Sequence, residues 1–337
     1  MKRILFIFLI FACQSNPTYP WFKGNLEELK SITGSKPIML DFYTETWGWC
    51  VRLEADTFLD DGFLKLTEEF NSIKINAGER DGSEIAEQYK VRGFPTVIFI
   101  DKDGNEIDRF VGYDTPDNFI PMVNDILAGK NTISALEAIL LENPNDYEVL
   151  FKIGNKYSDR GNTEISNKYL NQFLENTPDS MSDKIISTKY LLAKSGWENS
   201  DISGLQNFIK EYPDSDQCMS AYQMIARYYT TENDTVNEIQ TLLDMTQVFS
   251  ESSSAMNSYA WRMTELKQNL DDALIKAKRG VELAVDDSKS MILDTQAEIE
   301  WLLGDIESAI KTIKIAIELN PEDEYYQAQL EKFKVAN

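Results

Sequence analysis

Residues Asp41–Glu54, with the sequence DFYTETWGWCVRLE, decide how the N-terminal part of this 337-residue chain folds. The apolar run Pro37–Tyr43 leads into this stretch and predicts a buried strand. A helical pattern begins at Val51, directly after a Trp-Gly-Trp-Cys sequence that ends at Cys50. Because the amides at a helix N-terminus favour negative charge, a cysteine at this point lies where its thiolate is stabilised. The stretch therefore predicts a strand followed by a helix start that carries a cysteine.

A second stretch, Gly93–Thr96 (GFPT), comes just before the apolar run Val97–Ile100, which predicts another strand. Pro95 in this position predicts a tight turn, and prolines in tight turns are often preceded by a cis peptide bond. The rest of residues 20–130 alternates between helical and strand patterns. Besides the helix after Cys50, the predicted elements are a helix at 26–32, a strand at 38–43, a helix at 60–70, a strand at 72–76, a helix at 85–89 with its cap at 81–84, a hairpin of strands at 97–100 and 106–111, and a helix at 116–127.

These features together resemble the thioredoxin fold, most closely the bacterial secreted members whose motif reads Trp-Cys-Gly-Trp-Cys. The resemblance covers residues 20–130 and implies an α/β thioredoxin-like domain. In that family two cysteines, two residues apart, carry the redox chemistry. Cys50 aligns with the second cysteine, whereas Trp47 occupies the position of the first. Because dithiol exchange needs a second thiol to release the mixed disulfide, turnover at thioredoxin-like rates is not expected.

The resemblance leaves two candidates for a catalytic role, Cys50 and Asp41. Asp41 lies six residues before Trp47, where thioredoxins carry a buried acid that helps to ionise the second thiol. Three alternatives remain for Asp41. It has lost its function together with the first cysteine, it still adjusts the ionisation of Cys50, or it is a strand-end aspartate with local hydrogen bonds. For Cys50 we favour a packed, unreactive thiol over a reactive one, because the family's second cysteine is usually below the surface.

Aromatic side chains surround the position where the family docks its substrates. The resemblance implies a peptide-binding lip made of Trp47, Trp49, Phe94, Pro95 and Thr96. In the family, the backbone next to the cis proline pairs with an extended substrate peptide. The alternative is that Trp47 simply fills the space that the missing thiol leaves.

Strand patterns end near residue 130, and helical periodicity continues through residues 131–337. Residues 147–178 resemble the tetratricopeptide pattern closely, with Ser166 where alanine is usual and Pro178 at the end of the unit. The following units are expected to end at Pro213, to cover 219–249 and 256–285, and to include 293–321, with a capping helix at 322–335. Such repeats imply an all-α solenoid of four to five helix pairs, whose concave surface holds a peptide or a partner protein.

Residues 1–19 are expected to be an export signal and a linker. Two basic residues precede a short apolar run that is too short to span a bilayer. The sequence Ile10-Phe11-Ala12-Cys13 resembles a bacterial lipobox, which implies a lipid anchor on Cys13 and attachment to a membrane. The alternative is an ordinary cleaved signal with an incidental cysteine.

Composition narrows the classes of function. The chain has a formal net charge of −23 and no Lys/Arg-rich run, which argues against nucleic acid as a partner. It contains no histidine, which removes Ser-His and Cys-His nucleophilic pairs and histidine-ligated zinc. The sequence predicts no metal site and no cofactor, and Cys218 is expected to be a packed core residue.

Two hypotheses follow from the sequence. The first is an envelope protein that binds or assembles other proteins and is not an enzyme. The second is a thiol–disulfide oxidoreductase that works through Cys50 alone or with a partner's thiol.

Overall fold

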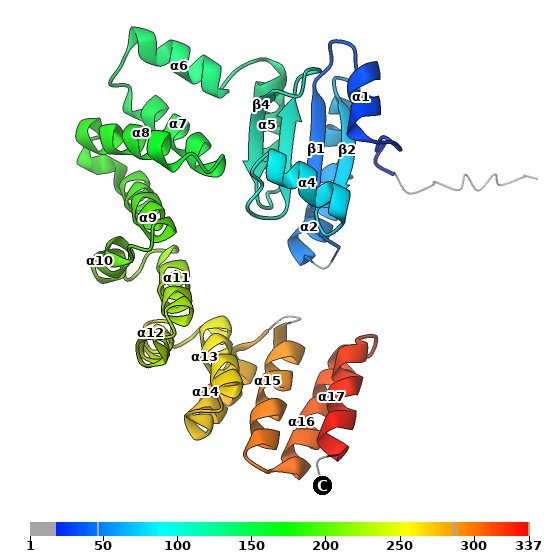
Figure 1. The fold of residues 1–337 in the computed structure, drawn as a ribbon, viewed down its shortest axis with the longest axis vertical. Coiled ribbons are helices and arrows are strands. Elements are labelled where there is room, and N and C mark those ends of the chain that lie inside the picture. The colour runs from blue at the N-terminus through cyan, green and yellow to red at the C-terminus, as the bar shows by residue number, and fades with distance from the viewer. Residues whose placement is uncertain (1–17, 46, 286–287, 336–337) are drawn as a thin grey trace, which may run out of the picture. The chain divides into compact units, whose positions relative to one another are not determined.

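The structure of the chain is a computed structural model that describes residues 18–45, 47–285 and 288–335. The chain forms two compact units, which divide between Asp179 and Ser180. The first unit contains a β-sheet with the helices that surround it and the first helices of the array (Figure 1). The predicted lipidation site, Cys13, lies outside the described residues. The domain boundary predicted near residue 130 stays a prediction.

The first unit is built on a mixed sheet with the strand order β2-β1-β3-β4. Its strands are β1 (Ile38–Tyr43), β2 (Asn71–Asn76), β3 (Thr96–Ile100) and β4 (Glu106–Val111). β1 pairs parallel with β2 and antiparallel with β3, and β3 pairs antiparallel with β4. Because β1 and β3 are covered on both faces, they read in the sequence as continuous apolar runs. The order of helices and strands confirms the predicted thioredoxin-like α/β fold.

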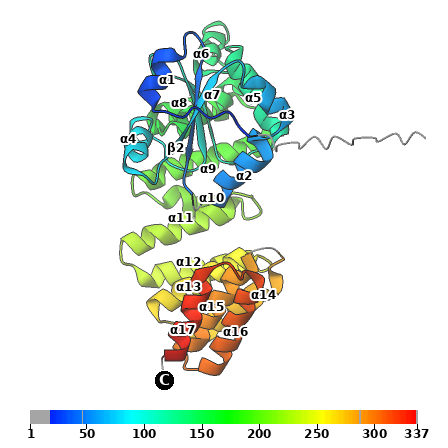
Figure 2. The same ribbon diagram turned by 90° about the vertical axis from the view of Figure 1, so that its right-hand side faces the viewer.

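Helices cover both faces of this sheet (Figure 2). On β1, Met39 belongs to a phenylalanine-rich cluster with Phe58 and Phe63, while its neighbours Ile38 and Leu40 belong to a cluster on the other face. Each buried phenylalanine contributes roughly 2–3 kcal/mol to folding by leaving water. The helices are α1 (Leu26–Ile32) and α4 (Arg80–Gln88) on one face, and η1 (Leu53–Phe58), α3 (Asp61–Leu66) and α5 (Pro116–Leu127) on the other, with α2 (Gly48–Arg52) leading into η1.

Two predicted helix boundaries are wrong. The helix predicted from 85 begins at Arg80, so the residues expected to cap it lie inside α4. Gly82 permits this early start, because a Cβ there would lie only 2.0 Å from the carbonyl oxygen of Asn76 at the end of β2. The helix predicted to reach residue 70 ends at Leu66. In addition, the helix after Cys50 continues as the π-helix η1 from Leu53, which the apolar spacing did not indicate.

After the sheet, the chain forms an extra helix, α6 (Ile133–Glu142), and then successive helix pairs. These are α7 (Tyr147–Asp159) with α8 (Thr163–Asn176), α9 (Ser182–Glu198) with α10 (Ser203–Glu211), α11 (Cys218–Thr231) with α12 (Thr235–Val248), α13 (Ser253–Leu266) with α14 (Leu270–Leu283), and α15 (Ser288–Leu302) with α16 (Ile306–Leu319). A short 3₁₀ helix, η2 (Asp179–Met181), precedes α9, and α17 (Glu324–Val335) ends the array. The predicted solenoid of helix pairs with a capping helix is confirmed. Cys218 is fully buried in α11, as predicted.

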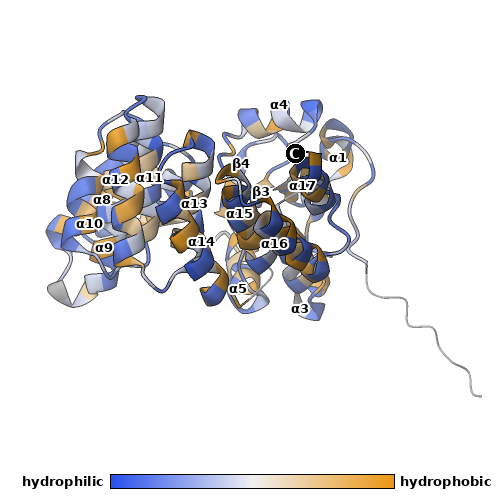
Figure 3. Ribbon diagram, turned by 90° about the horizontal axis from the view of Figure 1, so that it is seen from below, coloured by the Kyte–Doolittle hydropathy of each residue, from blue (hydrophilic) through white to orange (hydrophobic). Residues whose placement is uncertain are grey.

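Small residues allow the helices of a pair to approach each other. A Cβ at Gly154 of α7 would lie 2.6 Å from Leu170 Cδ2 of α8, so glycine is required at this contact. Ser166 of α8 donates a hydrogen bond of 2.8 Å to the carbonyl oxygen of Gly154. Polar and apolar residues alternate around the helices, as expected where each helix buries one face (Figure 3). None of the described helices is long and apolar enough to cross a lipid bilayer.

Within the first unit, an ion-pair network joins the edge strand β4 to helix α7. Asp108 of β4 is almost fully buried and pairs with Lys156 and, at 3.0 Å, with Arg160. Arg160 also lies 2.8 Å from Glu106, and Arg109 donates to the carbonyl oxygen of Asp159 at 3.3 Å. A buried carboxylate that loses its partners is costly, so this network holds the first helix pair against the sheet.

Candidate functional site

The sheet brings the two motifs of the sequence to the same edge. β3 runs antiparallel to β1, with Phe42 opposite Thr96. The residues that follow β1 and the residues that precede β3 therefore lie at the same end of the sheet. The segment after β4 links the two motifs. The Gly112 amide donates to the carbonyl oxygen of Pro95 at 2.8 Å, and the Tyr113 ring packs on the Trp49 ring at a centroid distance of 5.5 Å.

Cys50 lies in the first turn of α2, below the surface. Its amide donates to the carbonyl oxygen of Trp47 at 2.9 Å, and the residue is only 8% exposed. Burial raises the pKa of the Cys50 thiol, a hydrogen bond with the backbone of Thr44 acts in the opposite direction, and the charge of Asp41 adds to the rise. Cys50 is a free cysteine and the single cysteine among the described residues of the first unit. The position therefore does not give Cys50 the low-pKa thiolate of an attacking thiol.

Asp41 is buried in the middle of β1, on the face that carries Met39. Burial raises the pKa of its carboxyl to about 7, against the opposing charge of Lys74 and with a further rise from Glu54. Its Oδ1 atom is buried and has no hydrogen-bond partner among the described residues. The alternative that Asp41 is a strand-end aspartate with local hydrogen bonds therefore does not hold for its Oδ1 atom.

Lys74 is a member of the site that the sequence patterns did not single out. It lies opposite Asp41 in the pairing of β1 with β2. Its ammonium group pairs with Glu54 at 2.6 Å and lies 4.3 Å from the centre of the Tyr43 ring. The alternation along 72–76 marks Lys74 as a charged residue in a strand, but the strand register is needed to place it beside Asp41.

Trp47 and Trp49 are both exposed, at 52% and 49%. Trp47 therefore does not fill a buried space left by the missing thiol. Trp49 is held by the ring of Tyr113 and by the guanidinium of Arg52, which lies 5.6 Å from the Trp49 ring and 4.9 Å from the Tyr113 ring. Asp56 fixes this group by accepting hydrogen bonds from Arg52 at 3.0 Å and from Tyr113 at 2.9 Å. The result is an exposed aromatic surface beside Cys50, in which ring contacts and hydrogen bonds link Trp49, Arg52 and Tyr113.

Phe94, Pro95 and Thr96 lie next to this surface. The Phe94–Pro95 peptide bond is cis, as predicted. Pro95 is buried with its carbonyl bound to Gly112, and the Thr96 hydroxyl donates to the carbonyl oxygen of Gly93 at 2.8 Å. Within the described part of the chain, the amide and carbonyl of Phe94 have no backbone partner. Both groups can therefore pair with the backbone of another chain.

Cys50 should react slowly with thiol reagents. At neutral pH we expect iodoacetamide to modify Cys50 at least about tenfold more slowly in the folded chain than in urea, because the thiol is buried and its pKa is raised. Mass spectrometry of the Cys50 peptide measures both rates, with the urea-unfolded chain as the control. Fast modification of the folded chain below pH 7 would contradict this prediction.

The sheet order, the cis Phe94–Pro95 bond and the cysteine in the first turn of α2 define a thioredoxin-like domain, which an array of helix pairs follows. Residues 27–127 match the family model of the thioredoxin-like domain. Within the described residues, no group of three or more cysteine, aspartate or glutamate side chains is placed to hold a metal ion.

Two curated relatives and one solved structure are similar to parts of this chain. The chain is 24% identical over 110 residues to the thioredoxin-like protein HCF164, chloroplastic, of Arabidopsis thaliana, covering 33% of this chain and 41% of that protein. It is 29% identical over 104 residues to the thiol:disulfide interchange protein DsbD of Campylobacter jejuni strain RM1221, covering 30% of this chain and 18% of DsbD. The C-terminal part of a TPR repeat-containing protein from Cytophaga hutchinsonii aligns with a TM-score of 0.48 and 13% identity, covering 64% of this chain and 83% of that one. The chain thus spans less than half the length of these two curated relatives.

Proposed function

We propose that this protein is exported to the cell envelope and binds other proteins there. Its thioredoxin-like domain holds an extended peptide at a peptide lip, defined as Trp47, Trp49, Phe94, Pro95 and Thr96. Its helical array recruits a second protein. A lipid anchor on Cys13 attaches the mature chain to a membrane, as the lipobox-like sequence before that residue indicates.

The observation that carries this proposal is the state of the lip. Two tryptophan side chains are about half exposed beside the backbone of Phe94, which has no backbone hydrogen-bond partner among the described residues, while the neighbouring Cys50 is buried. Exposed aromatic side chains supply apolar contact area, and a free amide and carbonyl supply strand-like hydrogen bonds. This combination favours noncovalent binding of an extended chain over thiol chemistry.

The test is capture of proteins from an envelope extract by the mature chain. We expect Cys50→Ala to leave the captured set unchanged, and Trp47→Ala with Trp49→Ala to weaken capture at least about tenfold, because buried tryptophans dominate binding energy at interfaces. Leu141→Ala is the matched control, since Leu141 is an exposed apolar residue of α6 outside the lip. Equal losses in the lip variant and in Leu141→Ala would contradict the proposal.

A second candidate is an oxidoreductase that uses Cys50 with a partner's thiol. The observation that favours it is the pKa of Asp41, which at about 7 suits a group that accepts and returns a proton. In this case, the captured proteins would be bound through disulfides, would be released by dithiothreitol, and would disappear with Cys50→Ala.

A further inference from the structure

A cavity of about 530 Å³ in the second unit is lined by residues of α13, α15 and α17. Its walls combine aromatic and apolar side chains with polar ones. Trp261, Met291 and Tyr325 contribute side chains that are between two-fifths and one-half exposed, and Tyr326 forms a buried part of the wall. A large exposed aromatic surface in a hollow is typical of a binding site.

The cavity also has buried hydrogen-bond acceptors. Asp294 is 5% exposed and accepts hydrogen bonds from the Tyr325 hydroxyl at 3.3 Å and from the Gln329 amide at 3.0 Å. Asn257 supplies a second acceptor, its Oδ1 atom, which is buried and has no partner among the described residues. A buried acceptor without a donor costs free energy, which a ligand with N–H groups would recover.

The charges around the cavity are unbalanced. Among the described residues that line the cavity, Asp294 carries a charge and none is a lysine or an arginine. Lys332 is the neighbouring cation whose charge reaches Asp294, but its ammonium group is held by Glu298 at 2.6 Å and lies 4.7 Å from the centre of the Trp301 ring. Burial raises the pKa of Asp294. A close cation would compensate for this burial, but the ammonium group of Lys332 is held by Glu298 instead.

We propose that this cavity binds the cationic side chain of a lysine or arginine carried by an extended segment of a partner protein. The proposal rests on the proposed function, in which the helical array recruits a protein. Trp261 and Tyr325 line the cavity with aromatic rings that a cation can contact, Asp294 supplies the opposite charge, and Asn257 Oδ1 can accept a hydrogen bond from one of the ligand's N–H groups. The net charge of −23 steers basic segments toward the chain.

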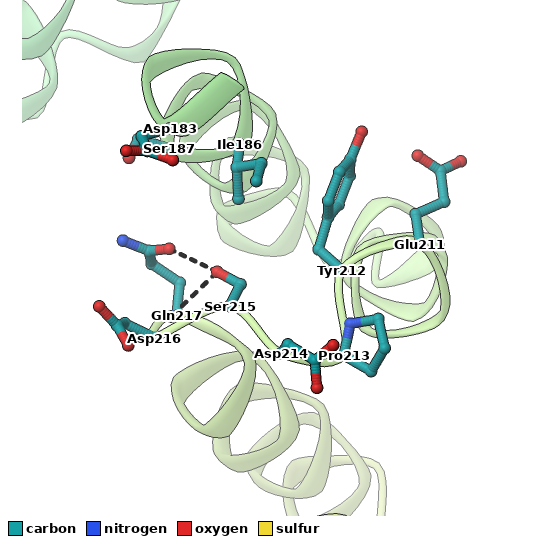
Figure 4. A pocket seen from close by; sticks show the side chains of 10 residues that line it. All are labelled: Asp183, Ile186, Ser187, Glu211, Tyr212, Pro213, Asp214, Ser215, Asp216 and Gln217. Atoms are coloured by element: carbon teal, nitrogen blue, oxygen red, sulfur yellow. Dashed lines mark hydrogen bonds between the residues drawn. The ribbon is translucent and has the colours of Figure 1, made fainter. Parts of the chain in front are cut away.

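A second cavity in the same unit provides a matched comparison (Figure 4). It has nearly the same volume, about 520 Å³, and is richer in acids, with Asp183, Glu211, Asp214 and Asp216 around Tyr212. These carboxylates are exposed to solvent, and Tyr212 is the sole aromatic lining residue. An exposed carboxylate stays hydrated and attracts a cation weakly. Comparing the two cavities therefore tests whether binding needs a buried carboxylate among aromatic side chains or only a high density of acidic residues.

The experiment uses the full chain labelled with 5-fluorotryptophan and observed by fluorine NMR. The probes are N-acetylarginine methylamide and N-acetylnorleucine methylamide. The norleucine side chain keeps the aliphatic stem of arginine but ends in a methyl group where arginine carries its guanidinium. Trp261→Phe identifies the Trp261 signal. We expect the arginine probe to shift this signal with at least about tenfold higher affinity than the norleucine probe, because a charge-assisted hydrogen bond contributes that much or more.

Three variants test the residues involved. Asp294→Asn should lower the affinity for the arginine probe at least about tenfold. Asp214→Asn in the second cavity should leave the affinity for this probe unchanged. Asn257→Leu removes an acceptor that has no hydrogen-bond partner among the residues the structure describes, so it should weaken binding of the arginine probe without unfolding the array. Unchanged signals of the other tryptophans report that each variant is folded.

Equal affinity for the two probes would overturn the proposal, and so would equal losses in Asp294→Asn and Asp214→Asn or the absence of any shift at Trp261. None of these results affects capture of proteins at the peptide lip, so the failure of this inference and the failure of the proposed function can be told apart.

Discussion

Replacing Trp47 with cysteine is expected to raise catalysis of insulin reduction by dithiothreitol at least about 100-fold over the natural chain, since an intramolecular thiol attacks with a very high effective concentration. Trp47 caps α2 and lies one turn before Cys50, whose amide donates to its carbonyl oxygen. A thiol at this exposed position gains from the helix amides and can attack a substrate disulfide, and Cys50 can then release it.

Two control variants sharpen this experiment. Trp47→Ser removes the indole without adding a thiol, and Trp47→Cys combined with Cys50→Ser leaves a single exposed thiol. Both variants should catalyse insulin reduction no faster than the natural chain does. If Trp47→Cys is folded but inactive, the loop geometry itself is unsuited to disulfide exchange, and the peptide lip is then more than a thioredoxin site that has lost one sulfur.

Asp41→Asn is expected to stabilise the first unit at pH 8 by roughly 2–4 kcal/mol and to have little effect near pH 4. The folded-state pKa of Asp41 is raised from 3.8 to about 7. Between these two values the folded state binds more protons than the unfolded state, so the contribution of Asp41 to stability falls as pH rises and levels off above about 7. Asparagine carries no charge, so it removes this dependence while its shape stays nearly the same.

Hydrogen exchange of the slowest amides in β1 and β3 measures this effect, because the core amides of the sheet report on the first unit and not on the whole array. Glu84→Gln is the control, since Glu84 is a well-exposed residue of α4. A carbon NMR titration of the Asp41 carboxyl provides the second readout. A gain in stability that is the same at pH 4 and pH 8 would contradict the prediction.

Local patterns predicted the main elements of the fold. The apolar runs before Thr44 and after Pro95 gave the two central strands, and small residues such as Gly154 and Ser166 marked the helix pairs. The early start of α4 was missed because it depends on the close contact of Gly82 with Asn76, which belongs to a different element. Such contacts exist only once the chain has folded, so spacing along the sequence does not report them.

The candidate site was predictable in part. The motif residues Asp41, Cys50 and Pro95 could be found from the sequence, because the resemblance to the thioredoxin motif assigns a position to each of them. Lys74 and Tyr113 could not, since they reach the site through strand register and through ring packing on Trp49. The raised pKa of Asp41 also needed the structure, because it follows mainly from burial.

The ion-pair network between β4 and α7 has a consequence for how the chain is divided. Cutting the chain after residue 130 would remove Lys156 and Arg160 and leave the buried carboxylate of Asp108 without its two partners. The same cut would remove the helix that packs against the edge strand β4. Unpaired backbone groups on an exposed edge strand promote strand pairing between molecules. The natural building block of the N-terminal half is therefore the sheet together with its first pair of helices, and a fragment intended to fold and stay monomeric should extend at least through α8.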